Sequence, residues 1–582
     1  MNLVRDCLGA LLLLGAGCHA NDDNRPCANW SQWGQNSGHL GGVCIRGQSP
    51  AKVLASVAVD PFGSQETAAA SGDLLVHYQV PIIVGNDVYV LAKTGSFTPP
   101  CDQPDGGGEL ACYAWSSQVW TESRYHWSGG KLIADWTVTS NWKPVPSEFA
   151  TSEPTFQPVV AGAALYLPDA AGTLLKVDRL SGATLAHLDP FNGAADPDRY
   201  VSGPLSTDSA GNVYYNVLKL DHDQPYLGDS KAWLVRVTPD DVITSVTYDT
   251  LVTGAPTGTS CHGTFAAAVP PPPLPWPPPP NADGTPVLPP AIDCGAQRPG
   301  LNVAPAVGAD GTIFTVSRAH RTSQDSFVVA LNPDLTTRWV ASLRDILNDA
   351  CGAFVPSDGD AKTAPRHCRP GTPMGVDRVT NQKPAGLIID QSSSSPVALP
   401  DGGVLYGAYS SYNGFRGHVF KFTAAGKPAG TYDFGWDYTP AVWQHDGTYS
   451  IVVKDNHYNY DDMGTPLGPY FVTQLDANLQ VEWKFQNTNI RSCAVDKDGK
   501  TSCVADHPYG FEWCINAPAI DKDGTVFAGG EDGVVYAIGQ GGVDRGHLFL
   551  SMSLGASYTP LSIDRDGRLY TQNDGKLVVV GR

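Results

Sequence analysis

The chain has 582 residues, among them 62 Gly and 47 Pro, and it carries a formal net charge of −20. Such acidity argues against nucleic acid or an anionic membrane as a partner, because both repel a negative surface. It fits a cationic or neutral ligand, or serves solubility alone. The abundance of Gly and Pro is typical of a turn-rich all-β protein.

Residues 1–20 are expected to be an export signal. Arg5 precedes the apolar run LGALLLLGAG, which is too short to span a bilayer. The letters GAGC, ending at Cys18, resemble a bacterial lipobox, which would make Cys18 the lipidated mature N-terminus. Cleavage after Ala20 without lipid is the alternative. We expect a bacterial periplasmic or outer-membrane protein whose only membrane contact is this anchor.

Eleven cysteines follow Cys18. In an exported chain most cysteines pair, and neighbours in sequence are the simplest partners. Cys514 is left over and is an alternative partner within the last pair. The predicted pairs are Cys27–Cys44, Cys101–Cys112, Cys261–Cys294, Cys351–Cys368 and Cys493–Cys503.

One phrase recurs eight times between residue 81 and the C-terminus: a Pro that opens an apolar strand, a tight Gly/Asp/Asn turn and a second apolar strand. A repeated hairpin of this kind indicates a solenoid or a propeller. The prolines that open the copies are Pro81, Pro158, Pro204, Pro305, Pro396, Pro440, Pro518 and Pro560.

Each hairpin is followed by a third apolar strand, such as LLKVD or VVYAI, and several units show a fourth, such as RWVASL or VEWKF. Four antiparallel strands form one propeller blade. The sequence therefore predicts an all-β, eight-bladed β-propeller over residues 51–582. The last unit ends after three strands, so we expect the strand at 51–60 to complete it and leave no open sheet edge.

Two stretches, residues 158–185 and 517–538, resemble the repeat of PQQ-type propellers, which occurs in quinoprotein dehydrogenases and in outer-membrane assembly lipoproteins. Residues 21–50, with ANWSQWGQNSGHLGG, resemble the entry segment of that family. The resemblance implies a Trp near the start of the fourth strand of each blade, and Trp136, Trp339 and Trp483 fit this position.

The loops between the second and third strands, and between blades, share one face of a propeller and are long here, for example 318–326, 454–469 and 248–301. Long loops on a rigid scaffold commonly carry the binding residues. Residues just before each Pro should converge at the channel mouth, although such mouths are polar simply because they are wet. The ligand-binding candidates are His77, Glu153, Arg199, Trp436, Tyr438, Glu512, Trp513 and Asn516.

Two loops suggest other roles. Asp455, Asn456 and Asp461 supply oxygen atoms of the kind that bind Ca²⁺, although the loop matches no EF-hand and a solvated polar loop is the alternative. The Pro-rich insertion 269–290 is expected to be a stiff polyproline II arm. It serves either as a spacer or as a handle for a partner protein.

The resemblance to quinoprotein dehydrogenases implies a site in which PQQ lies in the channel with Ca²⁺. Trp436 or Trp513 would then stack on the quinone, Glu153 or Glu512 would bind the metal, Asp390 or Asp437 would act as the base, and Arg298 would face the quinone. The chain has no pair of adjacent cysteines and no CxxCH haem motif.

A binding or scaffold protein explains the repeat, the export signal and the long loops without those motifs, and we favour it over a PQQ-dependent oxidoreductase of alcohols or sugars. Its partner would be a small molecule or another envelope protein.

Overall fold

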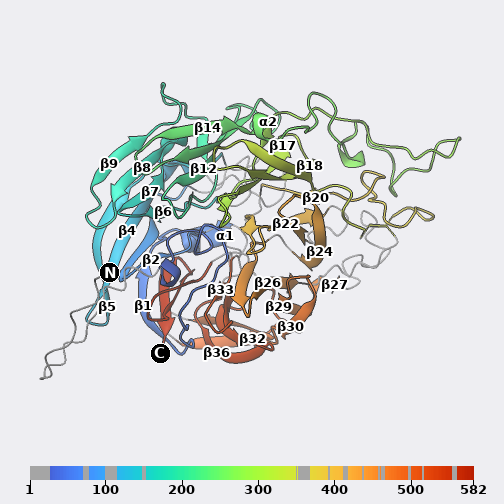
Figure 1. Ribbon diagram of the computed structural model, residues 1–582. Coiled ribbons are helices and arrows are strands. Elements are labelled where there is room, and N and C mark those ends of the chain that lie inside the picture. The colour runs from blue at the N-terminus through green and yellow to red at the C-terminus, as the bar shows by residue number, and fades with distance from the viewer. Residues whose placement is uncertain are drawn as a thin grey trace, which may run out of the picture.

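The structure is a computed structural model that describes residues 26–69, 76, 78–98, 115–146, 153–348, 350–351, 368–390, 394–410, 417–435, 438–456, 459–460, 466–495, 500–513, 517–552 and 560–582. Eight antiparallel sheets stand around a central axis (Figure 1). The chain is therefore an eight-bladed β-propeller with four-stranded blades, as the repeat predicts. In these residues no helix has the length and apolar character needed to cross a membrane.

The first four blades follow the chain order. Blade one contains β2 (Ile82–Val84), β3 (Asp87–Gly95), β4 (Gln118–Ser128) and β5 (Lys131–Thr139), and blade two contains β6 (Val159–Ala161), β7 (Ala164–Pro168), β8 (Leu174–Asp178) and β9 (Thr184–Leu188). The innermost strand of blade three is split into β10 (Arg199–Val201) and β11 (Ser206–Thr207), followed by β12 (Val213–Lys219), β13 (Lys231–Val237) and β14 (Ile243–Thr247). Blade four likewise has β15 (Gln297–Arg298), β16 (Ala306–Val307), β17 (Ile313–Ala319), β18 (Thr322–Leu331) and β19 (Thr337–Ser342).

The remaining blades repeat the pattern. Blade five contains β20 (Gly386–Leu387), β21 (Val397–Ala398), β22 (Val404–Ser410), β23 (Gly417–Phe422) and β24 (Pro428–Gly435). Blade six contains β25 (Ala441–His445), β26 (Thr448–Asn456), β29 (Tyr470–Leu475) and β30 (Val481–Gln486). Blade seven contains β33 (Ala519–Ile520), β34 (Val526–Gly529), β35 (Val534–Gly539) and β36 (Val543–Phe549), and blade eight contains β37 (Ser562–Ile563), β38 (Leu569–Asn573), β39 (Lys576–Gly581) and β1 (Lys52–Ala58).

The two ends of the ring meet in blade eight. β1 pairs antiparallel with β39, so that Val57 lies opposite Leu577 and Lys52 opposite Gly581. This pairing confirms the prediction that an N-terminal strand completes the last blade. It removes the unpaired edge that three strands would otherwise expose.

Inner and outer strands differ in residue pattern because they differ in burial. Inner strands such as β12 are buried along nearly their whole length, so they carry continuous apolar runs. The outer strand β5 has one face on its neighbour and one in solvent, and its burial alternates. Apolar side chains of adjacent blades pack together in four large clusters that form the core.

Three tryptophans of outer strands dock onto the next blade, as the resemblance implies. A methyl group at Gly426 in blade five would lie 2.6 Å from the ring of Trp339 in blade four, and the Trp339 indole donates to the carbonyl of Ala424 at 3.1 Å. Trp136 packs in the same way on Gly182, and Trp483 on Gly542. Glycine is required at these turns because the indole occupies the space of a β-carbon.

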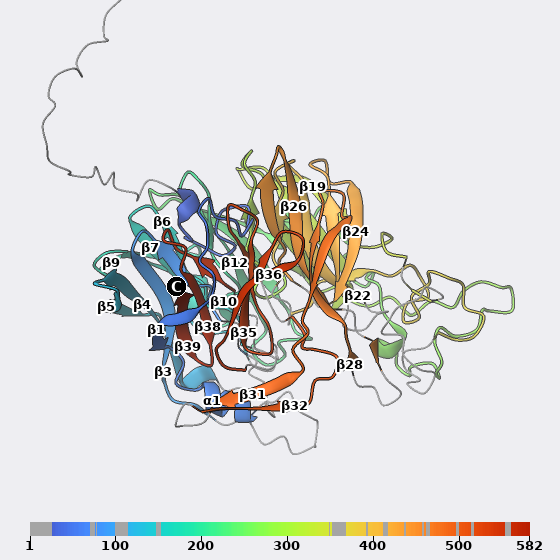
Figure 2. The ribbon, with the colours of Figure 1, turned by 90° about the horizontal axis from the view of Figure 1, so that it is seen from below.

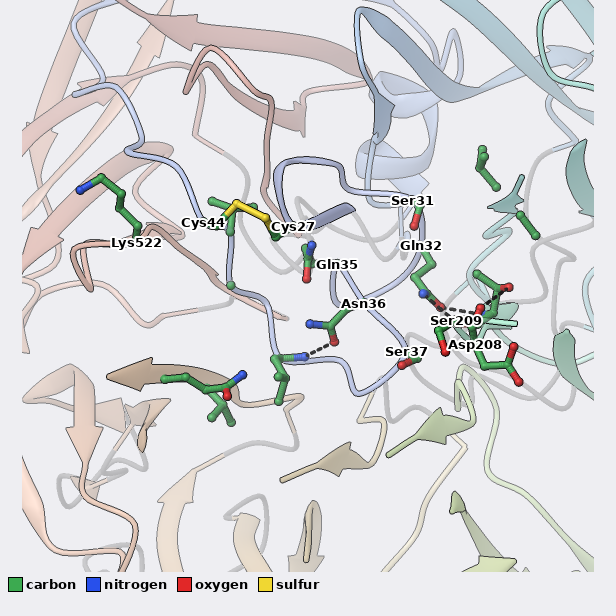
Figure 3. A pocket seen from close by; sticks show the side chains of 18 of the residues that line it. Cys27, Ser31, Gln32, Gln35, Asn36, Ser37, Cys44, Asp208, Ser209 and Lys522 are labelled. Atoms are coloured by element: carbon green, nitrogen blue, oxygen red, sulfur yellow. Dashed lines mark hydrogen bonds between the residues drawn. A yellow bond between two sulfur atoms is a disulfide. The ribbon is translucent and has the colours of Figure 1, made fainter. Parts of the chain in front are cut away.

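Residues 29–48 form a strap across the channel on the face of the short turns, and the strap hydrogen-bonds to every blade. The disulfide Cys27–Cys44 closes it into a loop (Figure 3). Two of the contacts are Val43 N to Ile520 O at 2.9 Å and Gln48 N to Gly567 O at 2.7 Å. From blade one to blade eight the contacted residues are Ile83, Val160, Thr207, Val307, Ala398, Val442, Ile520 and Gly567.

The opposite face carries the long connections and most of the added structure (Figure 2). The helix α1 (Gly63–Ala69) and the hairpin of β31 (Arg491–Val495) and β32 (Thr501–Ala505) lie there. The described residues also form small elements that belong to no blade, on either face. They are α2 (Tyr248–Leu251), β27 (Asn459–Tyr460), β28 (Pro466–Leu467) and the 3-10 turns η2 (Pro26–Ala28), η3 (Trp115–Ser117), η4 (Ala170–Gly172) and η5 (Phe265–Ala267).

The prediction of a long loop at residues 318–326 is wrong. β17 continues to Ala319 and β18 begins at Thr322, so the stretch 318–326 is a tight turn at His320 and Arg321. Polar residues in this stretch suggested a loop. They are accommodated within the strands, because Gln324 and Asp325 are buried by neighbouring loops.

Four of the predicted disulfides are present: Cys27–Cys44, Cys261–Cys294, Cys351–Cys368 and Cys493–Cys503. The pair Cys101–Cys112 and the extra Cys514 lie outside the described residues. Three of the four bonds fasten connections on the long-loop face, so this face is held more firmly than its loop lengths suggest.

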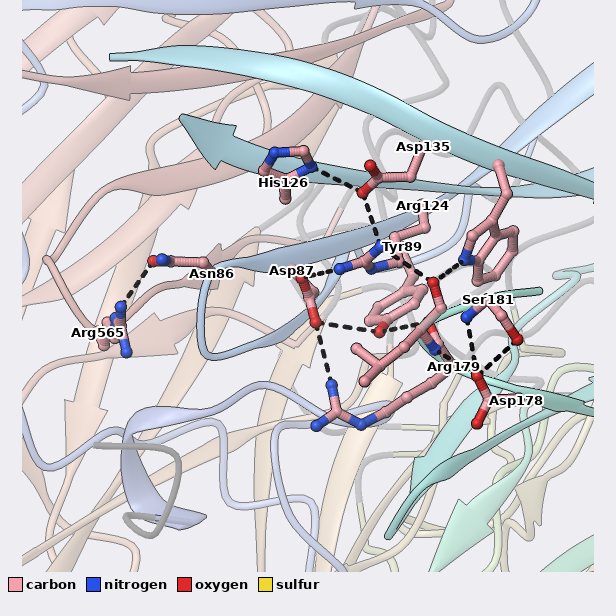
Figure 4. A network of polar contacts seen from close by, with 12 residues as sticks. Asn86, Asp87, Tyr89, Arg124, His126, Asp135, Asp178, Arg179, Ser181 and Arg565 are labelled. Carbon is pink, nitrogen blue, oxygen red and sulfur yellow. Dashed lines mark hydrogen bonds and ion pairs between the residues drawn. The ribbon is translucent and has the colours of Figure 1, made fainter. Parts of the chain in front are cut away.

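Charged side chains also join blades to one another. The Asp87 carboxylate of blade one accepts from Arg124 in its own blade at 2.8 Å and from Arg179 in blade two at 3.0 Å (Figure 4). Arg565 of blade eight donates to Asn86 of blade one at 2.8 Å. These contacts lock the first blade to both of its neighbours.

Candidate functional site

Three buried polar clusters at the joints between blades hold residues that the sequence singles out. The first surrounds Lys93, which approaches the carboxylates of Glu153 at 2.5 Å, Asp60 at 3.1 Å and Glu66 at 3.3 Å. The Trp120 indole also donates to Glu153 at 3.0 Å. Glu153 is therefore enclosed by protein groups.

Burial shifts the proton affinities in this cluster. It raises the pKa of Glu153 to about 8, with Lys93 opposing the rise and Glu66 adding to it. Burial also raises the pKa of Glu66. Burial lowers the pKa of Lys93, but the three carboxylates outweigh it and the net shift is upward. Because three carboxylates share one ammonium, the cluster retains a proton near neutral pH.

The second cluster lies between blades four and five. Arg298 Nη1 and Nη2 each donate to one oxygen of Asp390 at 2.7 Å, and Arg318 Nη1 approaches the same carboxylate at 3.3 Å. Arg298 Nε donates to His320 Nδ1 at 2.9 Å. Tyr226, from the loop between β12 and β13, is half-exposed beside this group.

Charge and burial in this second cluster fix the protonation states. Burial alone would raise the pKa of Asp390, but Arg298 and Arg318 hold it below its usual range. Burial and the neighbouring Arg298 lower the pKa of Arg318 to about 10. Burial and the two arginines lower the pKa of His320 to about 3, so His320 is neutral and accepts the bond from Arg298.

The third cluster links blades six and seven. The side-chain amide of Asn456, a metal candidate, donates to the backbone carbonyl of Trp513 and accepts from the backbone N–H of Trp513, both at 3.2 Å. The Trp513 ring is fully buried and packs edge-on against Tyr536, with ring centroids 5.1 Å apart. Asn456 therefore positions the backbone at Trp513, and the indole forms part of the core.

Asp455 is fully buried next to Asn456 and faces away from solvent. One of its oxygens accepts from Tyr432 at 2.7 Å, from Thr473 at 3.0 Å and from Lys484 at 2.7 Å. These bonds tie blade five to blade six. Across the described part of the chain, no group of three His, Cys, Asp or Glu side chains is arranged to hold a metal ion.

The other described candidates lie apart from one another. The Tyr438 ring is buried, and the backbone carbonyl of Tyr438 accepts from the Ser394 hydroxyl at 2.9 Å. Arg199 begins β10. Its guanidinium carbon lies 4.2 Å from the centroid of the Phe191 ring, and its Nε lies 3.5 Å from a carboxylate oxygen of Asp196. Glu512 accepts through its carbonyl from Glu531 N at 3.3 Å. The candidates outside the described residues are Cys18, His77, Trp436, Asp437, Asp461 and Asn516.

Trp513, Glu153 and Asp390 do not fit the roles that PQQ and Ca²⁺ would require of them. Trp513 has no exposed ring face for stacking, and Glu153 is already paired with Lys93. Asp390 is held as a carboxylate by two arginines, so its basicity is reduced. We therefore derive no step through a quinone.

Sequence patterns alone did not indicate Lys93, Asp60, Glu66 or Arg318. Asp60 and Lys93 are charged residues within otherwise apolar runs. A charge in a buried run needs a partner, so these positions could have been predicted to form internal ion pairs. The partner of each charge is set by tertiary packing and cannot be read from spacing.

No family model matches the chain, and no curated protein matches it. Among solved structures, a europium-containing methanol dehydrogenase is 9% identical, with a TM-score of 0.47 and coverage of 94% of this chain and 90% of that one. The quinohemoprotein alcohol dehydrogenase from Comamonas testosteroni is 10% identical, with a TM-score of 0.49 and coverage of 95% and 81%. BamB from Moraxella catarrhalis is 12% identical, with a TM-score of 0.35 and coverage of 85% and 100%.

Fold and site together define a class: a closed eight-bladed propeller whose channel is strapped on one face and whose blades are joined by buried ion pairs such as Lys93–Glu153 and Arg298–Asp390. Similarities at these levels say nothing about chemistry. We therefore base the function on the chain's own residues.

Proposed function

We propose that this protein is an exported binding or scaffold protein that holds its partner on the long-loop face of the propeller. The observation that carries the proposal is the uneven distribution of exposed apolar side chains. Of the 16 large apolar residues that are exposed in the described chain, nine lie on the long connections. They are Tyr226, Leu227, Val269, Leu274, Leu288, Met374, Ile490, Val504 and Tyr509.

Apolar side chains in water favour burial against a partner, and their exposure on the long connections and on the extension these form favours an interaction surface there. The loops that carry them are held in place, which lowers the entropic cost of binding. The disulfide Cys493–Cys503 fastens the hairpin next to Val504, and Cys261–Cys294 closes the base of the Pro-rich insertion.

The Pro-rich insertion is part of a two-loop unit. Arg369 donates from its backbone N–H to the carbonyl of Trp276 at 2.7 Å, and Asn381 donates to the carbonyl of Val287 at 2.8 Å. The insertion thus packs against the connection between blades four and five, and the pair extends beyond the ring (Figure 1). A braced extension of this kind favours a docking role over that of a loose spacer.

Export is the setting in which these disulfides form. Four of them in the described residues favour an oxidising compartment. A lipid on Cys18 would keep the protein at the outer membrane, and cleavage after Ala20 would release it into the periplasm.

Site-specific photo-crosslinking in a bacterial host that exports the chain tests this proposal. The photoreactive residue replaces Met374, Leu274 or Tyr509 on the long-loop face, or the similarly exposed Leu185 or Val543 on outer strands as matched controls. We expect discrete adducts from the long-loop positions and none from the controls. Adducts that form equally on outer strands would contradict the proposed binding face.

A further inference from the structure

The hairpin of β31 and β32 stands apart from the blades. It forms a two-stranded sheet of its own on the long-loop face (Figure 2). All residues of β32 are exposed, and Val504 is 67% exposed. The disulfide joins Cys493 and Cys503, which lie directly opposite each other in the register. The two strands are therefore held together although neither belongs to a larger sheet.

The register of the hairpin determines which backbone groups face outward. Asp506 N donates to Ile490 O at 3.2 Å, one step beyond the paired residues, so this position is hydrogen-bonded. Hydrogen-bonded and non-hydrogen-bonded pairs alternate along an antiparallel ladder. The pair Cys493–Cys503 is therefore non-hydrogen-bonded, and the distance of 4.1 Å between its Cα atoms agrees with the close spacing of such pairs. The backbone N–H and C=O of Cys503, and of the residues two positions to either side, point away from β31.

The outward edge of β32 is open. Among the residues that the structure describes, none pairs with the outward backbone groups of Thr501, Cys503 or Ala505. Unpaired groups along an exposed strand form a template for pairing with another extended chain. The edge of β31 is less open, because Ser492 and Cys493 are half-buried. The edge of β32 therefore offers backbone donors and acceptors, in strand spacing, to a partner.

The outer edges of the blades differ from this edge. The outermost pair of strands contains a register shift in seven of the eight blades. Such bulges twist an edge strand and are one of the ways in which proteins prevent edge-to-edge pairing. Blade three is the exception, and its outer strand β14 runs directly into the helix α2. The pairing of β31 with β32 has no register shift, so β32 keeps an edge suited to strand addition.

An open groove of about 490 Å³ lies at the base of the hairpin. Ile490 precedes β31, Pro508 and Tyr509 follow β32, and all three line the groove. Ile490 and Tyr509 are 45% and 49% exposed. A chain that pairs along β32 and continues past Ala505 for about three residues, at about 3.3 Å each, is long enough to reach Pro508. In strand addition the backbone supplies affinity, and a side-chain pocket of this kind supplies specificity.

Charge favours one kind of occupant. A second copy would bring together two chains that each carry a net charge of −20, and their repulsion disfavours that pairing. A segment that carries Lys or Arg is attracted to the same protein. We propose that β32 accepts an extended, basic segment of a partner protein as a third strand, with an apolar side chain of that segment in the groove beside Ile490 and Tyr509. This inference rests on the proposed binding role and names the class of its partner.

Binding of the peptide acetyl-Leu-Lys-Val-Thr-Val-Thr-Lys-Leu-amide to the full mature protein tests the proposal. Leu stands at both ends so that either strand direction can fill the groove. Fluorescence anisotropy measures the affinity, and amide hydrogen exchange locates the contact. We expect saturable binding that protects the amides of Thr501, Cys503 and Ala505. Replacement of both Lys by Glu should weaken binding, because the protein is acidic.

Two further peptides test whether the backbone carries the affinity. Each keeps every side chain and is N-methylated on one of the two alternate sets of residues. Only one set faces the edge of β32 in a paired strand, since neighbouring N–H groups point to opposite sides. One of these peptides should therefore bind about tenfold more weakly, the equivalent of about one or two hydrogen bonds, and the other should keep its affinity.

Two substitutions at one exposed position locate the site. Ala505→Pro removes an outward N–H and leaves the hydrogen bonds to β31 intact, whereas Ala505→Thr keeps that N–H in a residue that favours strands. We expect Ala505→Pro to bind the basic peptide about tenfold more weakly and Ala505→Thr to bind it as the native protein does, both at an unchanged melting temperature. Equal binding by Ala505→Pro and the native protein, or no saturable binding of the peptide, overturns the proposal.

The crosslinking experiment separates this proposal from the one on which it rests. Adducts at Met374 together with no peptide binding would overturn the strand site and leave the binding face standing. No adducts at any long-loop position would overturn the binding face and the strand site with it. A dimer in sedimentation that Ala505→Pro dissociates would place a second copy on the edge of β32, which also overturns the proposal.

Discussion

Arg298 and Asp390 form a two-point ion pair across the boundary of blades four and five, with both N–O distances at 2.7 Å. Both residues are sequence-based candidates for chemistry, and the structure brings them together. Arg298 is 1% exposed and Asp390 10% exposed, so the pair is formed in a nearly dry environment. Its geometry is that of a structural joint between blades.

The ion pair gives the first prediction. Asp390→Asn leaves Arg298 and Arg318 buried without a counter-charge, so we expect a loss of about 3–5 kcal/mol in the free energy of unfolding. Chemical denaturation at pH 7 measures it. Asp293→Asn, which breaks the exposed pair with Arg321, is the matched control and should cost less than about 1 kcal/mol. Equal losses in both variants would show that the Arg298–Asp390 pair contributes no more than a surface pair.

The second prediction concerns pH. Burial raises the pKa of Glu122 to about 8, while Gln79 opposes the rise through a hydrogen bond of 3.0 Å. A carboxyl whose pKa is higher in the folded state binds more protons there, so stability is lost as pH rises from about 4 to about 8. Glu122→Gln keeps the acceptor and removes this loss.

Thermal melting from pH 5 to pH 9 checks the second prediction. Glu122→Gln should match the native protein at pH 5 and exceed it at pH 9 by more than about 1.4 kcal/mol, the equivalent of one pKa unit. The exposed carboxylate Glu482, changed to Gln, should alter neither end of the range. A Glu122→Gln protein that loses stability at pH 9 would show that this carboxylate is favourable when charged.

The third prediction concerns the docking tryptophans. Gly426→Ala would place a methyl group 2.6 Å from the ring of Trp339 at a φ of +74°. Gly447→Ala has a φ of +76° but nothing within 4 Å, so it reports backbone strain alone. We expect Gly426→Ala to be less stable than Gly447→Ala by about 1–3 kcal/mol in urea denaturation, the cost of overpacking. Equal losses would mean that the indole moves aside freely.

The fourth prediction concerns the Pro-rich insertion. The bonded Cys261 and Cys294 lie 33 positions apart in the chain, and removal of the bond by a double change to Ala should cost about 3–4 kcal/mol on loop-entropy grounds. We expect limited proteolysis to cut first between residues 262 and 293, while the circular dichroism of the ring is retained. Cleavage first within a blade would instead indicate that the clamp holds the ring together.

Local sequence was enough to predict the ring. The strand at 51–60 that became β1 was predictable because the last unit has only three strands. The Pro-headed hairpins and the docking positions Trp136, Trp339 and Trp483 depend on contacts within one blade or between successive blades. Such contacts recur with the repeat, so the pattern carries them. The four described disulfides were also predictable, because their cysteines are close in sequence.

The sites depend on contacts that do not repeat. Lys93 meets Asp60 and Glu153 from three separate segments, and Asn456 reaches Trp513 across 57 residues. The strap follows a path over all eight blades that no periodic signal describes. Sequence reasoning therefore placed Glu153 and Trp513 near the channel and Asn456 in a metal-binding loop. It gave all three ligand roles, whereas packing gave them protein partners.

The measurement that most directly separates a binding protein from a dehydrogenase is a cofactor titration. The mature protein is mixed with PQQ and Ca²⁺, and its absorbance, melting temperature and dye-linked oxidation of alcohols and sugars are recorded. We expect no saturable change in absorbance, no rise in melting temperature and no oxidation. Saturable PQQ binding with turnover would contradict the proposed binding role and make this chain a quinoprotein oxidoreductase.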